Sequence, residues 1–151
     1  MIHYCTVYNT ETGEIMSCSN FSINDDPEAI AKNYSVRVRA YGEDSHKHIP
    51  IESNPEIHYV VTLNDLPTVV ERPRLLVNID KVQIEAGEFS TLTGIPDPCR
   101  IVIDAADPTV ETQTYDIDGG GFEFEPESPG VYTIEVHRFP FLPWRVEITA
   151  S

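Results

Sequence analysis

The stretch GGGFEFEPESPGVYTIEV, residues 119–136, decides the fold of this chain. It holds two runs in which apolar and polar residues alternate, separated by a segment with two prolines and a glycine. Such alternation is typical of half-buried β-strands, because successive side chains of a strand point to opposite faces of a sheet. We therefore predict strands over residues 121–124 and 131–136. Their expected inward side chains are Phe122, Phe124, Tyr132, Ile134 and Val136.

The same pattern extends on both sides of this stretch, through most of the second half of the sequence. Short strands are predicted at a spacing of about 8–14 residues with turn residues between them, as in a β-sandwich. The further predicted strands are residues 75–79, 82–86, 89–93, 100–104, 113–116 and 145–149. Ile101, Ile103, Val146 and Ile148 supply the other inward side chains, and Trp144 is expected to pack near the end of the sandwich.

The start of the chain is expected to form a hairpin. Residues 3–9 and 14–20 flank a short turn in which Gly13 is free to adopt a positive φ. Symmetric pairing about this turn places Cys5 opposite Cys18 and Val7 opposite Met16, with all four on one apolar face. The two thiols then either form a disulfide or, as we favour, remain free and pack as small hydrophobic groups.

A short helix is predicted next, over residues 27–33, with Asp25 or Asp26 as the N-cap and Pro27 in its first turn. Residues 35–41 alternate apolar and basic side chains, which favours a half-buried strand. Residues 42–55 are polar and broken by proline, so they are expected to be mostly loop. Strands over 57–63 and 68–71, joined by a turn at 64–67, complete this part.

The chain is expected to divide at Arg72-Pro73, where proline ends the strand pairing. The predicted fold class is mainly β: a small α+β N-terminal module, residues 1–72, followed by a β-sandwich, residues 73–151. The first part carries five basic and 11 acidic side chains, a formal charge of −6, and the second carries five and 14, a charge of −9. Acidity is therefore spread over both parts and is not confined to a tail.

The total formal charge of −15 on 151 residues excludes several classes of partner. Phosphate is repelled, so neither nucleic acid nor an anionic membrane is an expected partner. No run approaches the roughly 18–20 apolar residues of a membrane span, and the first residues lack the features of a signal peptide. Three cysteines are too few for a disulfide framework, so synthesis in a reducing cytoplasm is expected.

Catalytic signatures do not occur in the sequence, so we expect no enzymatic activity and no cofactor. His46 and His48 project to the same side of an extended segment, which permits a metal site shared with neighbouring subunits or a simply solvated segment. The acidic residues at 104–107 and 116–118 suit either calcium or ordinary loops. We favour the loops, because residues 116–118 lack the remaining ligands of a calcium-binding loop.

The most apolar short run is FPFLPW, residues 139–144. Its candidate partner-contact residues are Phe139, Phe141, Leu142 and Trp144, because exposed apolar patches mark interfaces. The alternative is a loop tucked over the core of its own sandwich. Either way, its two prolines restrain the loop and lower the entropy that binding would cost.

Several short segments resemble, in their order along the chain, small tail-region proteins of tailed bacteriophages. These segments are Tyr8 with Thr12-Gly13-Glu14-Ile15, His58-Tyr59-Val60, Arg72-Pro73, Thr93-Gly94-Ile95-Pro96, Gly130-Val131-Tyr132, Phe139-Pro140-Phe141 and Val146-Glu147-Ile148. The resemblance implies a C-terminal immunoglobulin-like domain and a structural role in the virion tail, as a fibre or baseplate accessory protein. It also implies binding to other virion proteins, and a homo-oligomer suits a symmetric tail.

Two other functions remain open from the sequence. An immunoglobulin-like module can attach to glycans or proteins of a host surface, for which Tyr115 or Trp144 would supply an exposed aromatic ring. A capsid decoration protein differs from the tail assignment only in its position on the particle.

Overall fold

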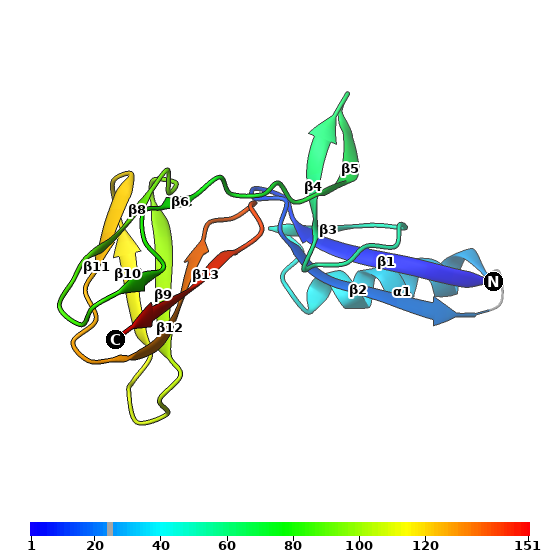
Figure 1. Cartoon of the computed structure of the whole chain (residues 1–151). Coiled ribbons are helices and arrows are strands. Elements are labelled where there is room, and N and C mark those ends of the chain that lie inside the picture. Colours follow the sequence, from blue (N-terminus) through cyan, green and yellow to red (C-terminus); the bar gives the residue numbers. More distant parts are fainter. Residues whose placement is uncertain (24–25) are drawn as a thin grey trace. The chain divides into compact units, whose positions relative to one another are not determined.

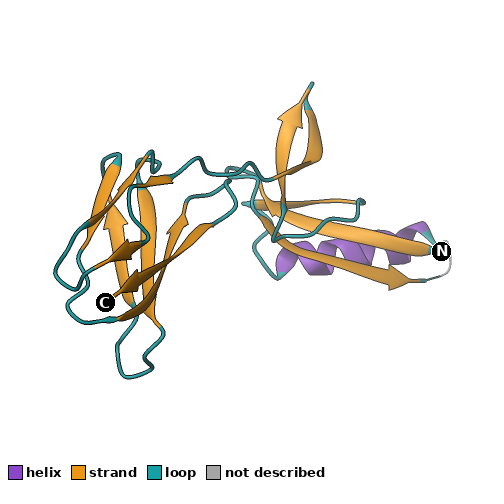
Figure 2. Cartoon of the chain, viewed as in Figure 1, coloured by secondary structure: helices purple, strands orange, loops and turns teal. Residues whose placement is uncertain are grey.

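The computed structural model describes residues 1–23 and 26–151 (Figure 1). The chain is mainly β with a small α-helical part, as predicted for the fold class (Figure 2). It divides into two compact units, an N-terminal unit Met1–Arg72 and a C-terminal unit Pro73–Ser151.

The N-terminal unit is built on an antiparallel sheet with the strand order β2-β1-β3. Its strands are β1 (Ile2–Asn9), β2 (Ile15–Ser22) and β3 (His46–Ile49). Helix α1 (Pro27–Arg39) lies along one face of this sheet (Figure 2), where Val38 packs with the fully buried Cys5 and Val7. Because β1 is the central strand and is covered on both faces, Thr6 is also completely buried.

The predicted register of the first hairpin is wrong by one residue. Cys5 lies opposite Ser19 and Thr6 opposite Cys18, since a β-bulge near Val7 and Tyr8 shifts the pairing. A one-residue shift moves side chains to the other face of a strand. Met16, which was expected on the apolar face, is accordingly 38% exposed.

The predicted break between a short helix and a strand at residues 35–41 is also wrong, because α1 continues to Arg39. Tyr34 and Val38, four residues apart, face the sheet, whereas Val36 is 56% exposed. Beyond Arg39, Gly42 terminates the helix: its φ is +103° and its N–H donates to the Val38 carbonyl at 3.2 Å.

The helix begins at Pro27, as predicted. Asp26 is the N-cap, and its side chain accepts a hydrogen bond from the Glu28 N–H at 3.1 Å. The alternative cap, Asp25, lies outside the described residues.

Residues 42–55 are mostly loop, as predicted, except that His46–Ile49 form β3, which pairs with β1. The next two strands, β4 (His58–Leu63) and β5 (Leu66–Glu71), form a separate hairpin. Its turn is shorter than predicted and consists of Asn64 and Asp65, with φ of 51° and 62°. Two successive positive φ values are those of a tight hairpin turn that follows strand twist.

Gly13 attaches the β4–β5 hairpin to the sheet. Its carbonyl accepts a hydrogen bond from the Val60 N–H at 2.8 Å, and Val60 joins a small core with Tyr8, Ile15 and Ile49. The φ of Gly13 is +78°, and a Cβ atom here would lie 2.0 Å from the Val60 carbonyl oxygen. Only glycine permits this approach of two backbones.

The C-terminal unit is a sandwich of a five-stranded sheet, in the order β10-β9-β12-β13-β7, and a three-stranded sheet, in the order β11-β8-β6. The strands are β6 (Asn78–Ile79), β7 (Gln83–Ile84), β8 (Ser90–Thr93), β9 (Cys99–Ala105), β10 (Gln113–Ile117), β11 (Gly121–Phe124), β12 (Gly130–His137) and β13 (Trp144–Ala150). Each strand predicted in this part of the sequence has a counterpart here, in some cases a shorter one.

Side chains of both sheets meet in one core. Leu92 comes from the three-stranded sheet, and Ile101, Ile134 and Ile148 come from the five-stranded sheet; all four are fully buried. The predicted inward side chains therefore lie inside, although Phe122, Val146 and Trp144 are only partly buried against the core.

Tyr132 fixes the turn that precedes β12. Its hydroxyl donates a hydrogen bond to the Ser128 carbonyl at 2.8 Å, while its ring packs edge-on against Phe124. A tyrosine near the start of this strand, bonded to the backbone a few residues upstream, is the tyrosine corner found in immunoglobulin-like sandwiches. The alternation in residues 131–136 predicts a core position for Tyr132 but no partner for its hydroxyl.

Tyr132→Phe should lower the free energy of unfolding of the C-terminal unit by about 1–1.5 kcal/mol, because the Ser128 carbonyl loses its donor. Urea unfolding followed by the fluorescence of Trp144, the single tryptophan, measures this change. Tyr115→Phe is the matched control, since Tyr115 is exposed and its hydroxyl donates to the exposed Gln113 side chain at 2.9 Å. Equal effects of the two substitutions would contradict a special role for the corner.

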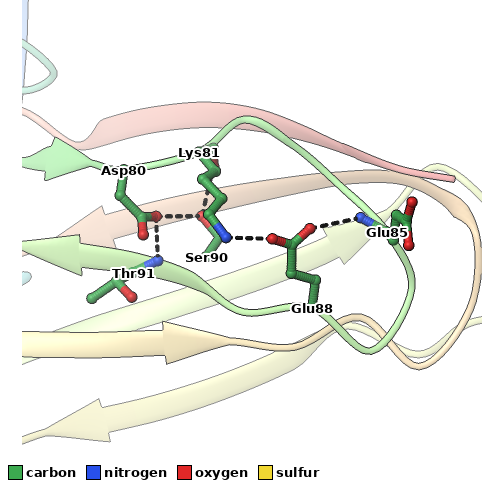
Figure 3. Close-up of polar contacts among 6 residues, drawn as sticks. All are labelled: Asp80, Lys81, Glu85, Glu88, Ser90 and Thr91. Atoms are coloured by element: carbon green, nitrogen blue, oxygen red, sulfur yellow. Dashed lines mark hydrogen bonds and ion pairs between the residues drawn. The ribbon is translucent and has the colours of Figure 1, made fainter.

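Between β6 and β7 the chain bends and passes from the three-stranded sheet to the five-stranded sheet. A cluster of polar side chains stabilises this bend (Figure 3). Ser90 is fully buried and donates to the Lys81 carbonyl at 2.6 Å. Asp80 accepts from the Thr91 N–H at 2.7 Å, and Lys81 forms an ion pair with Glu88. The bend is therefore fixed by bonds to β8 and to the turn that precedes β8.

The Thr91 N–H holds the pKa of the Asp80 carboxyl below its usual value. The ionised carboxylate therefore stabilises the folded state above the ordinary pKa of aspartate, and this contribution is lost as the pH falls. At pH 7, we expect the wild-type protein to unfold at a higher urea concentration than Asp80→Asn. The difference between the two midpoints should shrink below about pH 4. A difference that stays constant down to about pH 2 would contradict this interaction.

Candidate functional site

The predicted contact loop joins β12 to β13 within the C-terminal unit. Phe139, Phe141, Leu142 and Trp144 are all half-buried, neither fully exposed nor enclosed. The loop is tied down by its backbone, because the Leu142 N–H donates to the Pro73 carbonyl at 2.8 Å. Trp144 packs against the core of the sandwich. This agrees in part with the alternative prediction, in which the loop lies over its own sandwich.

A shallow hollow of about 320 Å³ lies beside this loop. Leu75, Leu142 and Trp144 supply apolar surface, and Arg74 and Arg145 lie at its margin. Arg145 is 3.8 Å from Glu135, a weak and exposed ion pair. The hollow therefore offers apolar contact area next to positive charge on an otherwise acidic unit.

The structure gives His46 and His48 contacts within their own unit. The Nδ1 atom of His46 lies 2.8 Å from the Ser45 hydroxyl and 3.2 Å from the Gly42 carbonyl. The ring of His48 stacks on Tyr34 at 4.3 Å between centroids, and burial lowers the pKa of His48. Within the described residues, no group of three or more potential metal-ligating side chains occurs.

The two cysteines of the first hairpin belong to different surroundings. Cys5 packs under α1, and burial raises the pKa of its thiol, which keeps it protonated. The sulfur of Cys18 instead accepts a hydrogen bond from the Ser53 N–H at 3.2 Å. Both thiols are free, because the shifted register turns them to opposite faces of the sheet.

The acidic residues considered for calcium mostly serve local hydrogen bonds. Asp107 accepts from both the hydroxyl and the N–H of Thr109, and Asp104 accepts from the Thr112 hydroxyl. Asp116 pairs with Arg100 at 3.1 Å. These contacts are typical of loop and strand ends.

Sequence reasoning missed a cavity of about 250 Å³ in the C-terminal unit. Its apolar walls include Ile103 from β9, Phe124 from β11 and Tyr132 from β12. Carboxylates at its margin come from the β9–β10 loop and from the segment between β11 and β12; they are Glu111, Glu125 and Glu127. Glu125 and Glu127 flank the buried Pro126, and this spacing of two acids around a proline was the available signal.

No protein-family model matches the chain, and no curated protein matches it. Among the described residues, no helix has the length and apolar character needed to cross a membrane.

Proposed function

We propose that this chain is a non-enzymatic structural protein of a bacteriophage virion, located in the tail as a fibre or baseplate accessory component. It is made in the host cytoplasm, assembles as a homo-oligomer and binds other tail proteins. The observation that carries the proposal is the apolar hollow beside residues 139–144, on a unit with a formal charge of −9.

The physical argument concerns where contacts can form. A formal charge of −15 keeps free copies apart and soluble, so association requires local surface that is apolar and not negative. Leu142 and Trp144 supply apolar area, and the guanidinium of Arg74 attracts acidic groups of a neighbour. The backbone bond from Leu142 to Pro73 holds the loop in place, which reduces the ordering cost of binding.

Electron microscopy of phage particles that carry a gold-labelled, epitope-tagged copy tests the location. We expect label on the tail and a loss of incorporation for Leu142→Glu, which places a charge in the hollow. Val82→Glu is the matched control, because Val82 is 45% exposed on the same unit and lines neither the hollow nor the 250 Å³ cavity. Label confined to the capsid would contradict the tail assignment and support a decoration protein.

Attachment to a host surface is the second candidate, favoured by one observation. Tyr115 is 40% exposed on β10 and its ring lies 5.6 Å from that of Phe122, so it presents an aromatic face. Aromatic faces are common in binding sites because they offer rigid contact area. Binding of purified protein on a glycan array, abolished by Tyr115→Ser, would favour this role over the tail component.

A further inference from the structure

We propose that the 250 Å³ cavity of the C-terminal unit binds the basic side chain of a partner polypeptide, a cationic group carried on an apolar stem. This inference deepens the proposed role in virion assembly. Its claim that the cation belongs to a partner protein rests on that role. The lining residues of the cavity do not overlap those of the hollow beside residues 139–144.

The inside of the cavity suits an alkyl chain. Ile103 and Phe124 are almost fully buried and Tyr132 is 8% exposed, so the walls are rigid parts of the core. The Tyr132 hydroxyl is occupied by the Ser128 carbonyl, which leaves its ring as the available surface. Lysine and arginine side chains bury their methylene groups along such walls while keeping their charge near water.

The margin of the cavity suits a cation. Glu111, Glu125 and Glu127 have no hydrogen-bond or ion-pair partner among the described residues, and no lysine or arginine lines the cavity. Tyr115 adds an aromatic ring at the same margin, and a cation held over such a face gains further attraction. A bound ammonium or guanidinium would supply the counter-charge that these carboxylates lack among the described residues.

Charge argues against the other occupants. An anion would meet three carboxylates within a unit of formal charge −9, so it is repelled both locally and at distance. A neutral apolar chain would fill the walls but would remove water from the carboxylates without providing a counter-charge, which costs free energy. A basic side chain satisfies both parts of the cavity.

The test uses the full chain, labelled with ¹⁵N, and three blocked amino acids as probes: the Nα-acetyl methylamides of lysine, arginine and norleucine. We expect the lysine probe, the arginine probe or both to shift amide signals of residues 113–117 and 124–128, with dissociation constants of the order of millimolar, as for small weak ligands. The norleucine probe, which has the stem without the charge, should bind at least about fivefold more weakly.

Variants then locate the charge. Glu125→Gln and Glu127→Gln should each weaken binding of the basic probe about two- to fivefold, and raising the ionic strength should do the same. Glu147→Gln is the matched control, since Glu147 lies exposed on β13 outside the cavity and makes the same change of charge. Tyr115→Val should weaken the basic probes and leave the norleucine probe unaffected.

Defined outcomes overturn the inference. Equal shifts with the norleucine and basic probes, equal effects of Glu125→Gln and Glu147→Gln, or no shifts at millimolar concentration would each exclude a cation site. Stronger binding of choline than of both basic probes would instead assign the cavity to a quaternary ammonium ligand. These results are independent of microscopy: label found off the tail would refute the assembly role while leaving probe binding intact.

Discussion

Gly13→Ala should be among the most damaging substitutions in the N-terminal unit, lowering its free energy of unfolding by about 3 kcal/mol or more. The new Cβ would lie 2.0 Å from the Val60 carbonyl oxygen, so the β4–β5 hairpin must move. Moving it breaks the Val60–Gly13 hydrogen bond and opens the core around Tyr8, at a cost added to the left-handed backbone strain. A unit of this size has roughly 4–10 kcal/mol of stability in total.

Urea unfolding followed by circular dichroism measures this loss, with Gly42→Ala as the control. Gly42 also has a positive φ, +103°, but a Cβ there meets only the Ser45 hydroxyl oxygen at 3.6 Å. Its substitution therefore adds backbone strain without a clash and should cost about 1–2 kcal/mol. Similar losses for the two variants would refute the close contact of Gly13 with Val60, and an equally large shift of the Trp144 transition would mean that the change acts on the whole chain.

The strands of the C-terminal unit were predictable because each carries its own signal. In residues 131–136, every second side chain is apolar, and glycine or proline lies close by in the sequence. The alternation matches the pleat, and burial on one face confirms it: Ile134 and Val136 are fully buried, and Thr133 and Glu135 are partly exposed.

The predicted end of the helix was wrong because residues 34–39 fit both the helical and the strand periodicity. Val36 and Val38 alternate with arginines, as in a strand, but Tyr34 and Val38 also share one face of a helix. The tertiary structure decides between them, since a helix places Tyr34 and Val38 together against one face of the sheet. Gly42 was a stop signal for a longer helix.

The hairpin register and the cavity could not be predicted from local sequence patterns, because both depend on contacts between distant parts of the chain. A bulge near Val7 moves Cys18 to the other face, and the same hairpin is bonded through Gly13 to Val60, 47 residues away. The cavity likewise gathers Glu111 and Glu125 from separate loops. The bulge has no local sequence signal, and the acids around Pro126 signal only part of the cavity, because nothing near them indicates that Glu111 joins them.

Ile134→Ala is expected to destabilise the C-terminal unit by about 3–4 kcal/mol, the usual cost of emptying a large fully buried site. Ile134 lies in β12, in the middle of the five-stranded sheet, between Ile103 of β9 and Val146 of β13. Neighbouring strands on both sides restrict the collapse of the backbone into the space left by the lost methyl and methylene groups, so little of the cavity cost is recovered.

Urea unfolding followed by Trp144 fluorescence tests this expectation, because the only tryptophan belongs to the same unit. Ile134→Val removes one methylene group and should cost about 1 kcal/mol, which gives a graded series at one site. Thermal unfolding of the alanine variant should occur more than about 10 °C below wild type, since each kcal/mol shifts the Tm of a small domain by roughly 4–8 °C. Losses below about 1 kcal/mol for Ile134→Ala would mean that the two sheets do not share a tightly packed core at this position.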